Sequence, residues 1–202
     1  MKFILVCLSL LLSTAAMAQV SRLKTPQPVA ESTLQLFPLG MEMRYERNND
    51  QELATHGFLN FAFAYQRNNL SALFEYSKYS EDSGNATTSI DHSHQEMILW
   101  GRWHFLRSKK EFMPLQFSIY GGLGVGTYQD EVKTTLLGTS QTDKSGNKVL
   151  SGLAVGGDIA YGFTKDFGVM AALEGRTLFA GDYDPNPVFS GLARLGIFFS
   201  LN

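Results

Sequence analysis

The sequence predicts an all-β fold, an eight-stranded antiparallel up-and-down transmembrane β-barrel. From Leu115 to Val125 every second residue is apolar or glycine, whereas the residues between them include Gln116, Ser118 and Tyr120. This period of two recurs in eight segments, and charged residues repeatedly occupy the less apolar face. No stretch after residue 18 approaches the roughly 18 consecutive apolar residues of a transmembrane helix. A sheet crosses a bilayer only when it closes on itself, because every backbone polar group must be paired.

The amino-terminal residues resemble a secretory signal. Residues 1–18 contain Lys2, an apolar run from Phe3 to Leu12 and a small-residue end at Ala18, after which we predict cleavage. Residues 19–36 have no sustained period and are predicted to be an extended periplasmic lead-in, followed by the barrel at 37–202. The only cysteine, Cys7, lies in the signal, so we expect neither disulfides nor thiolate sites in the mature chain.

Composition limits the possible partners. The chain is 44% hydrophobic with 19 glycines, values that a soluble β protein also shows, so the strand pattern decides the fold class. A net charge of −2 provides no basic surface for nucleic acid. We therefore expect no nucleic-acid partner, and no motif in the chain predicts a cofactor.

The first four predicted strands span residues 39–46, 57–66, 70–79 and 92–105. In the first, Met41 and Met43 alternate with Glu42, Arg44 and Glu46, which places the charges on the inward face. The second and third strands set aromatic residues outward against small and polar ones. The fourth is longer than a membrane crossing requires, so its first residues are expected to project into water.

The last four predicted strands span residues 115–128, 150–163, 167–179 and 188–201. Their inward faces are distinguished by glycines and by a few charges, namely Asp158, Glu174, Arg176 and Arg194. Gly122, Gly124, Gly126 and Gly156 are expected to leave room for Trp100, Tyr120 and arginine side chains, because this run lacks the lysine of a phosphate-binding loop.

The connections alternate between long and short. Short turns follow residues 66, 106 and 163, whereas the connections at 47–56, 80–91, 129–148 and 181–187 are predicted to be polar loops. With the amino terminus in the periplasm, the long loops lie outside the cell. Aromatic residues then fall into two interfacial belts, an inner one of Tyr65, Trp103, Phe105, Phe117, Tyr161, Phe163, Phe167 and Phe199 and an outer one of Tyr45, Tyr76, Phe179 and Phe189.

The carboxyl-terminal strand carries a family resemblance. Arg194, Gly196, Phe199 and Leu201 resemble the signal that the barrel-assembly machinery reads, although Asn202 follows here. Residues 39–201 as a whole resemble the small eight-stranded outer-membrane barrels that include the OmpA transmembrane domain, OmpX and the opacity-type porins. The resemblance implies a monomer in the outer membrane of a Gram-negative bacterium, in contact with lipid and lipopolysaccharide. We expect the loops to contact an extracellular ligand or partner protein.

The inward charges predict a filled lumen. An eight-stranded barrel has an interior just wide enough for side chains. An unpaired charge there costs several kcal/mol, so we expect linked ion pairs that plug the lumen rather than a gated ion path. The ten predicted members are Glu42, Arg44, Glu46, Glu75, Glu96, Arg102, Asp158, Glu174, Arg176 and Arg194.

The densest titratable cluster, His92, His94 and Glu96, is the candidate active site. Lipid A deacylases place a serine two residues after the histidine, where this chain has His94, so the resemblance fails at the nucleophile. A metal site formed by these three side chains lacks a fourth ligand. We expect no enzymatic activity, and polar residues at the base of a loop are the simpler interpretation of the cluster.

The sequence thus favours a structural and surface-interaction role, with the barrel as anchor and the loops as binding surface. Three alternatives stay open. They are a lipid A-modifying enzyme, a transporter of small solutes or hydrophobic molecules, and a soluble lipocalin-like barrel with its apolar face turned inward.

Overall fold

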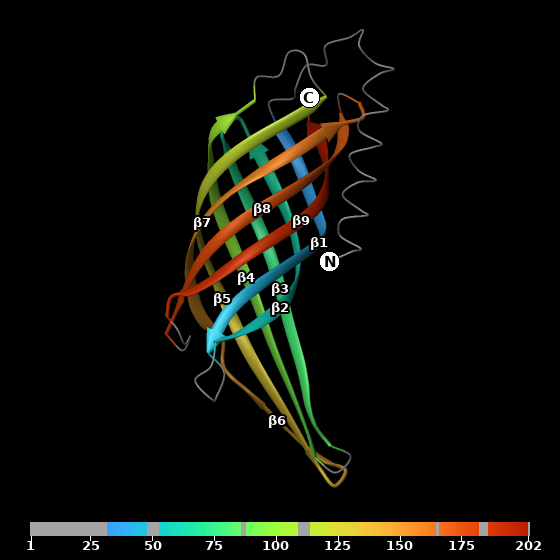
Figure 1. The fold of residues 1–202 in the computed structure, drawn as a ribbon, viewed down its shortest axis with the longest axis vertical. Coiled ribbons are helices and arrows are strands. Elements are labelled where there is room, and N and C mark those ends of the chain that lie inside the picture. The colour runs from blue at the N-terminus through green and yellow to red at the C-terminus, as the bar shows by residue number, and fades with distance from the viewer. Residues whose placement is uncertain are drawn as a thin grey trace.

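The chain folds into a closed antiparallel barrel (Figure 1). The computed structural model describes residues 32–47, 53–85, 88–108, 114–164, 166–181 and 186–201. The strands in these ranges are β1 (Ser32–Arg47), β2 (Leu53–Arg67), β3 (Leu70–Asn85), β4 (Thr88–Arg107), β5 (Leu115–Leu136), β6 (Thr139–Lys144), β7 (Lys148–Gly162), β8 (Phe167–Ala180) and β9 (Val188–Leu201). No helix in the described ranges is long and apolar enough to cross a membrane.

Eight of these strands form the ring. Neighbours in sequence pair from β1 to β5, β5 then pairs with β7, and β9 returns to pair with β1. β6 lies outside the ring and pairs with the last residues of β5. The predicted fold class, an eight-stranded up-and-down transmembrane barrel, is confirmed.

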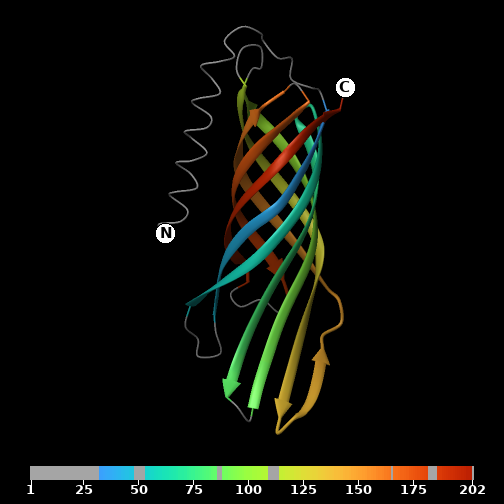
Figure 2. The same cartoon turned by 90° about the vertical axis from the view of Figure 1, so that its right-hand side faces the viewer.

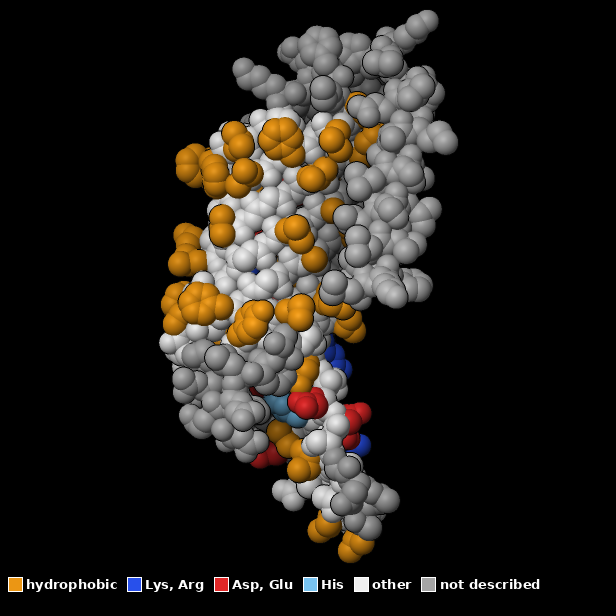
Figure 3. Space-filling model, viewed as in Figure 1, with side chains coloured by type: hydrophobic (Ala, Val, Ile, Leu, Met, Phe, Trp, Pro, Cys, Tyr) orange, Lys and Arg blue, Asp and Glu red, His pale blue; other side chains and the backbone are white. Residues whose placement is uncertain are grey.

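The side chains alternate as a membrane barrel requires. Along β4, Met97, Leu99 and Trp103 are 51%, 54% and 60% exposed, whereas Ile98 and Trp100 are fully buried. Figure 3 shows hydrophobic side chains spread over the barrel, with charged ones gathered beyond one end. Because the apolar face points out and the charges point in, the fold is the inverse of a soluble lipocalin-like barrel.

β1 begins earlier than predicted, at Ser32 rather than Leu39, within the segment assigned to the lead-in. The register of β1 against both neighbours shifts between Leu36 and Gly40, a bulge that contains Pro38. A bulge is one of the few places where a sheet accepts proline, and it moves the outward face from even to odd positions. Because the outward face changes parity at the bulge, a period-two pattern read from Leu39 onward does not extend to the first residues of the strand.

Two predicted loops are wrong, because β3, β4 and β5 run past the barrel as a sheet (Figure 2). Most of 80–91 and 129–148 is strand, and pairing continues to Asn85 opposite Thr88 and to Leu136 opposite Thr139. We call residues 79–85, 88–95, 129–136 and 139–144 the extension. Its tip is a two-residue turn in which Leu137 and Gly138 both have positive φ, 49° and 82°, which suits a tight hairpin.

The remaining connections are described only in part. Residues 1–31, which hold the predicted signal and most of the lead-in, lie outside the described residues, as do 48–52 and 182–185 of the first and last predicted loops.

Candidate functional site

The lumen holds a cluster of buried charges, which we call the lumen network. Each member sits at an inward position of β1, β3, β4, β8 or β9, and none is more than 5% exposed. The network comprises four glutamates and four arginines: Glu42, Arg44, Glu75, Glu96, Arg102, Glu174, Arg176 and Arg194.

Arg176 is the centre of the network. Both of its terminal nitrogens donate to Glu75, its Nε donates to Glu174 Oε1 at 2.5 Å, and its Nη1 lies 3.5 Å from Glu42 Oε2. The side chain thus joins carboxylates of β1, β3 and β8. Paired guanidinium nitrogens on one carboxylate also fix the orientation of both groups.

The other arginines extend the network in both directions. Arg194 donates to Glu75 and, through Nε at 2.8 Å, to the amide oxygen of Asn60. Arg102 donates to Glu174 at 2.5 Å. On the opposite side Arg44 contacts Glu42 at 2.9 Å and binds both oxygens of Glu96. All eight residues are therefore linked.

Among the described side chains, the charges in the network balance. The sequence predicts ten members, six acids and four arginines, whereas the described network has four acids and four arginines. The side chain of Glu46 lies outside the described residues. Asp158 lies near the short turns, where it accepts a hydrogen bond from Ser118 at 2.7 Å and interacts electrostatically with Arg102 of the network. The period-two pattern predicts which face of the sheet a residue occupies, but it does not predict how far along the barrel axis the side chain lies.

Aromatic side chains pack against the arginines. Trp100 is fully buried, and the guanidinium of Arg176 lies 4.8 Å from its ring centroid. A Cβ on Gly124 would stand 2.6 Å from the Trp100 ring, and one on Gly152 would stand 2.8 Å from it. The inward glycines thus make room for this indole, as the sequence predicted for Gly124.

The cluster of His92, His94 and Glu96 converges only in part. His94 lies between Glu96 Oε1 at 2.9 Å and Asp130 Oδ1 at 2.6 Å. The ring of His92 is 43% exposed and 3.6 Å from Asp130. Asp130 was missed because it fell in a predicted loop. In the part of the chain that the structure describes, no three acidic, histidine or cysteine residues are placed to hold a metal ion.

His94 links the lumen network to the extension through its contacts with Glu96 and Asp130. Its neighbours on the outward face, Lys78, Gln95 and Gln129, are polar, so it lies beyond the apolar band. Burial alone would lower the pKa of His94, but hydrogen bonds to Asp130 and Glu96 raise the pKa to about 9. The imidazole is therefore positive at neutral pH and offsets Asp130.

A second cluster lies near the short turns and was not predicted. Ser118 donates to Asp158, which leaves the Ser118 oxygen to accept from His104 Nδ1 at 3.0 Å, and His104 Nε2 then accepts from Ser71 at 3.0 Å. These are the residue types of a hydrolase triad. However, Ser71 is 8% exposed and points into the barrel, and His104 Nδ1 stands 4.0 Å from Asp158. We interpret the cluster as polar packing that fills this end.

No protein-family model matches the chain, and no curated protein matches it. Among solved structures, Neisserial surface protein A is 16% identical over 85% of this chain and 98% of its own, with a TM-score of 0.55. Ail of Yersinia pestis is 16% identical over 85% of this chain and 99% of its own, with a TM-score of 0.49. The likeness to the Neisserial protein, added to the eight-stranded closure and the apolar exterior, shows that the chain has the fold of the small eight-stranded outer-membrane β-barrels.

Proposed function

We propose that the protein is an outer-membrane anchor that holds the extension outside a Gram-negative cell as a surface for binding another protein. Its barrel contacts lipid and lipopolysaccharide as a monomer, and Arg194, Gly196, Phe199 and Leu201 serve the barrel-assembly machinery. The lumen network closes the barrel, and no catalytic step is assigned to it.

The extension is the observation that carries this proposal. β1 starts and β9 ends at the end of the barrel that holds the short turns, whereas the extension projects from the opposite end (Figures 1 and 2). From Glu96 to its tip the sheet spans about eight residues, or roughly 25 Å. Its side chains are mostly polar, which suits a solvated surface.

Both edges of the extension offer backbone groups. β2 pairs with β3 only as far as Lys78, so within the described residues β3 from Ser80 onward has a strand partner on the β4 side alone. β6 likewise pairs with β5, and all six of its residues are exposed. An open strand edge binds an extended peptide through main-chain hydrogen bonds, with alternate side chains giving specificity.

The filled lumen favours an anchor over a transporter. Eight charges with Trp100 and Tyr120 occupy the cross-section, and each of these side chains is at most 5% exposed. Moving an ion through would require breaking several buried ion pairs at once. We expect no resolved single-channel steps in planar bilayers at neutral pH, and steady conductance would favour the transporter instead.

The binding role is tested by shortening the extension in register. Because Lys133 is paired with Thr142, replacing residues 133–142 with Asn-Gly leaves the pairs Val132–Asp143 and Glu131–Lys144 in place. Random peptides displayed on phage are selected against the full chain in nanodiscs. We expect enriched peptides that lose binding to the shortened variant and that bind poorly when their backbone amides are methylated.

The control variant carries Leu137→Asn in the turn, which keeps both edges and allows the positive φ. Heat-modifiable gel migration shows that each variant is folded. Peptides that bind the full and shortened chains equally would place recognition outside the β5–β6 hairpin, because the shortened variant keeps the β3 edge. Peptides insensitive to amide methylation would exclude edge pairing.

A further inference from the structure

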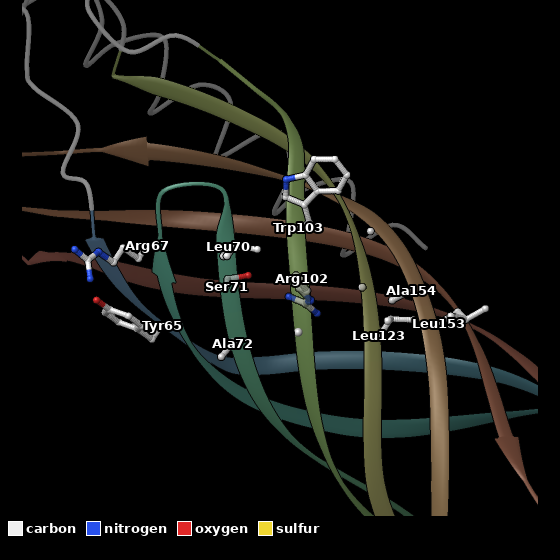
Figure 4. A pocket seen from close by; sticks show the side chains of 13 residues that line it. Tyr65, Arg67, Leu70, Ser71, Ala72, Arg102, Trp103, Leu123, Leu153 and Ala154 are labelled. Carbon is white, nitrogen blue, oxygen red and sulfur yellow. The ribbon is translucent and has the colours of Figure 1, made fainter.

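A groove crosses the lipid-facing side of the barrel near the short turns (Figure 4). It has a volume of about 780 Å³, within the range of about 300–1,000 Å³ that ligand sites show. Its floor consists of outward positions with small or absent side chains on three adjacent strands, Ala72, Gly101 and Gly121. The groove is therefore a depression in the apolar exterior, and its lining also includes the inward positions Ser71, Arg102, Gly122 and Ala154.

The walls are large and apolar. Leu70 on β3 and Trp103 on β4 are a cross-strand pair that forms one wall, and they are 65% and 60% exposed. Leu123 and Leu153 are paired across β5 and β7 and form the opposite wall. Since these side chains lie within the membrane-facing surface, the molecules that reach the groove are lipids or other membrane-embedded proteins.

One end of the groove is cationic. Arg67 ends β2 beside Leu70 on the outward face, and it is exposed. Tyr65 lines the same end, and Figure 4 shows its hydroxyl on the side of the Arg67 guanidinium. This end lies next to the short turn at Asn68, where lipid headgroups meet water. Tyr65 Oη donates to Ser32 Oγ at 3.4 Å, so the cation at that height is the group that complements a phosphate.

We propose that this groove binds one acyl chain of an anionic glycerophospholipid, with Arg67 holding its phosphate. The acyl chain lies on Ala72, Gly101 and Gly121, between Trp103 and Leu123. In the proposed orientation the lipid belongs to the periplasmic leaflet. The site is independent of the extension, and a symmetric bilayer tests it even if the proposed binding role fails.

Trp103 reports occupancy directly. The chain has two tryptophans, and Trp100 is fully buried in the lumen, so lipid-borne quenchers reach Trp103. The full chain is reconstituted into dibrominated phosphatidylcholine, and unbrominated dioleoyl phosphatidylglycerol is added stepwise. We expect fluorescence to recover at a mole fraction about fivefold lower than random mixing predicts, which is the effect of one basic residue near an anionic lipid.

Two pairs of variants distinguish the effect of the Arg67 charge on lipid preference from the effect of the shape of the groove. Arg67→Gln is expected to return recovery to the random-mixing curve, whereas Lys78→Gln, an exposed cation beyond the other end of the apolar band, leaves the preference intact. Gly101→Leu is expected to fill the floor and abolish the preference, because a Cβ there meets nothing closer than 4.0 Å. Gly191→Leu, with nothing within 4 Å of its Cβ, is the matched control on β9.

Three results would overturn the proposal. Wild-type recovery that follows random mixing would show that the groove has no preference. An equal response of Arg67→Gln and Lys78→Gln would assign any preference to net charge. Weak quenching of Trp103 in pure brominated lipid, together with a cross-linked dimer, would show that a second copy covers the groove.

Discussion

Replacing Arg176 with methionine should destabilise the barrel more than any single change on its surface. The substitution keeps an unbranched side chain of similar length but removes the charge that joins Glu75, Glu174 and Glu42. The lumen network then changes from four positive and four negative charges to a net −1. The excess negative charge is buried, where water cannot solvate it.

The magnitude follows from the partners that remain. Removing one partner of a buried ion pair costs about 3–5 kcal/mol. Here Glu75 retains Arg194 and Glu174 retains Arg102, so we expect the lower end of that range, about 3 kcal/mol of unfolding free energy. Adding Glu75→Gln restores neutrality, and the double variant should be more stable than the sum of the two single effects by about 1–2 kcal/mol.

The assay is reversible urea unfolding in lipid vesicles, followed by tryptophan fluorescence and gel migration. Lys78→Met serves as the surface control, because Lys78 is exposed on the outside and is not part of the groove, and should change stability by no more than about 0.5 kcal/mol. If Arg176→Met costs no more than this control, the ion pairs do not stabilise the barrel. If the double variant is simply additive, Arg176 and Glu75 are not energetically coupled.

Two further predictions concern packing and pH. Gly124→Ala should cost about 1–3 kcal/mol by overpacking, because its Cβ would stand 2.6 Å from the buried Trp100 ring. Gly101→Ala should be neutral in the same urea assay, because the nearest atom to its Cβ would be 4.0 Å away. The folded-state pKa of His94 is raised to about 9 from an ordinary 6.5. Its stabilisation, at most about 3 kcal/mol, is therefore complete below pH 6.5 and is lost as pH rises through 9. Asp130→Asn should lower that pKa in an NMR titration, and an unchanged titration would contradict the assigned hydrogen bond.

Most of the barrel was predictable because a membrane strand has to alternate. The face of every described network residue, from Glu42 to Arg194, follows from the period-two pattern, because a one-residue shift in strand register would point each charged side chain at the lipid. The pattern fails where the backbone changes parity, as at the bulge containing Pro38. It also fails in the extension, because a sheet with water on both sides needs no alternation and therefore resembles a loop in sequence.

The partners inside the lumen could not be predicted. Arg176 and Glu75 are 101 residues apart and lie on non-adjacent strands, so their contact depends on the tilt and stagger of the whole barrel. The same limit applies to Asp158, whose position near the short turns does not follow from the period-two pattern. Asp130 lies in a segment whose sequence predicts a loop, so its contact with His94 does not follow from the sequence.

The extension and the lumen network are joined by side chains as well as by backbone. Asp130, at the base of the extension, binds His94, which binds Glu96, which binds both terminal nitrogens of Arg44 inside the barrel. His94 also stacks on Tyr128, with ring centroids 5.5 Å apart. A free sheet with two open edges would bend and twist about its base, and a partner pairing with an edge would have to supply the ordering free energy. In the proposed function, these linked charged side chains hold the base of the extension from within the barrel and so lower that cost, which favours a lumen filled with ion pairs over an apolar core of the same volume.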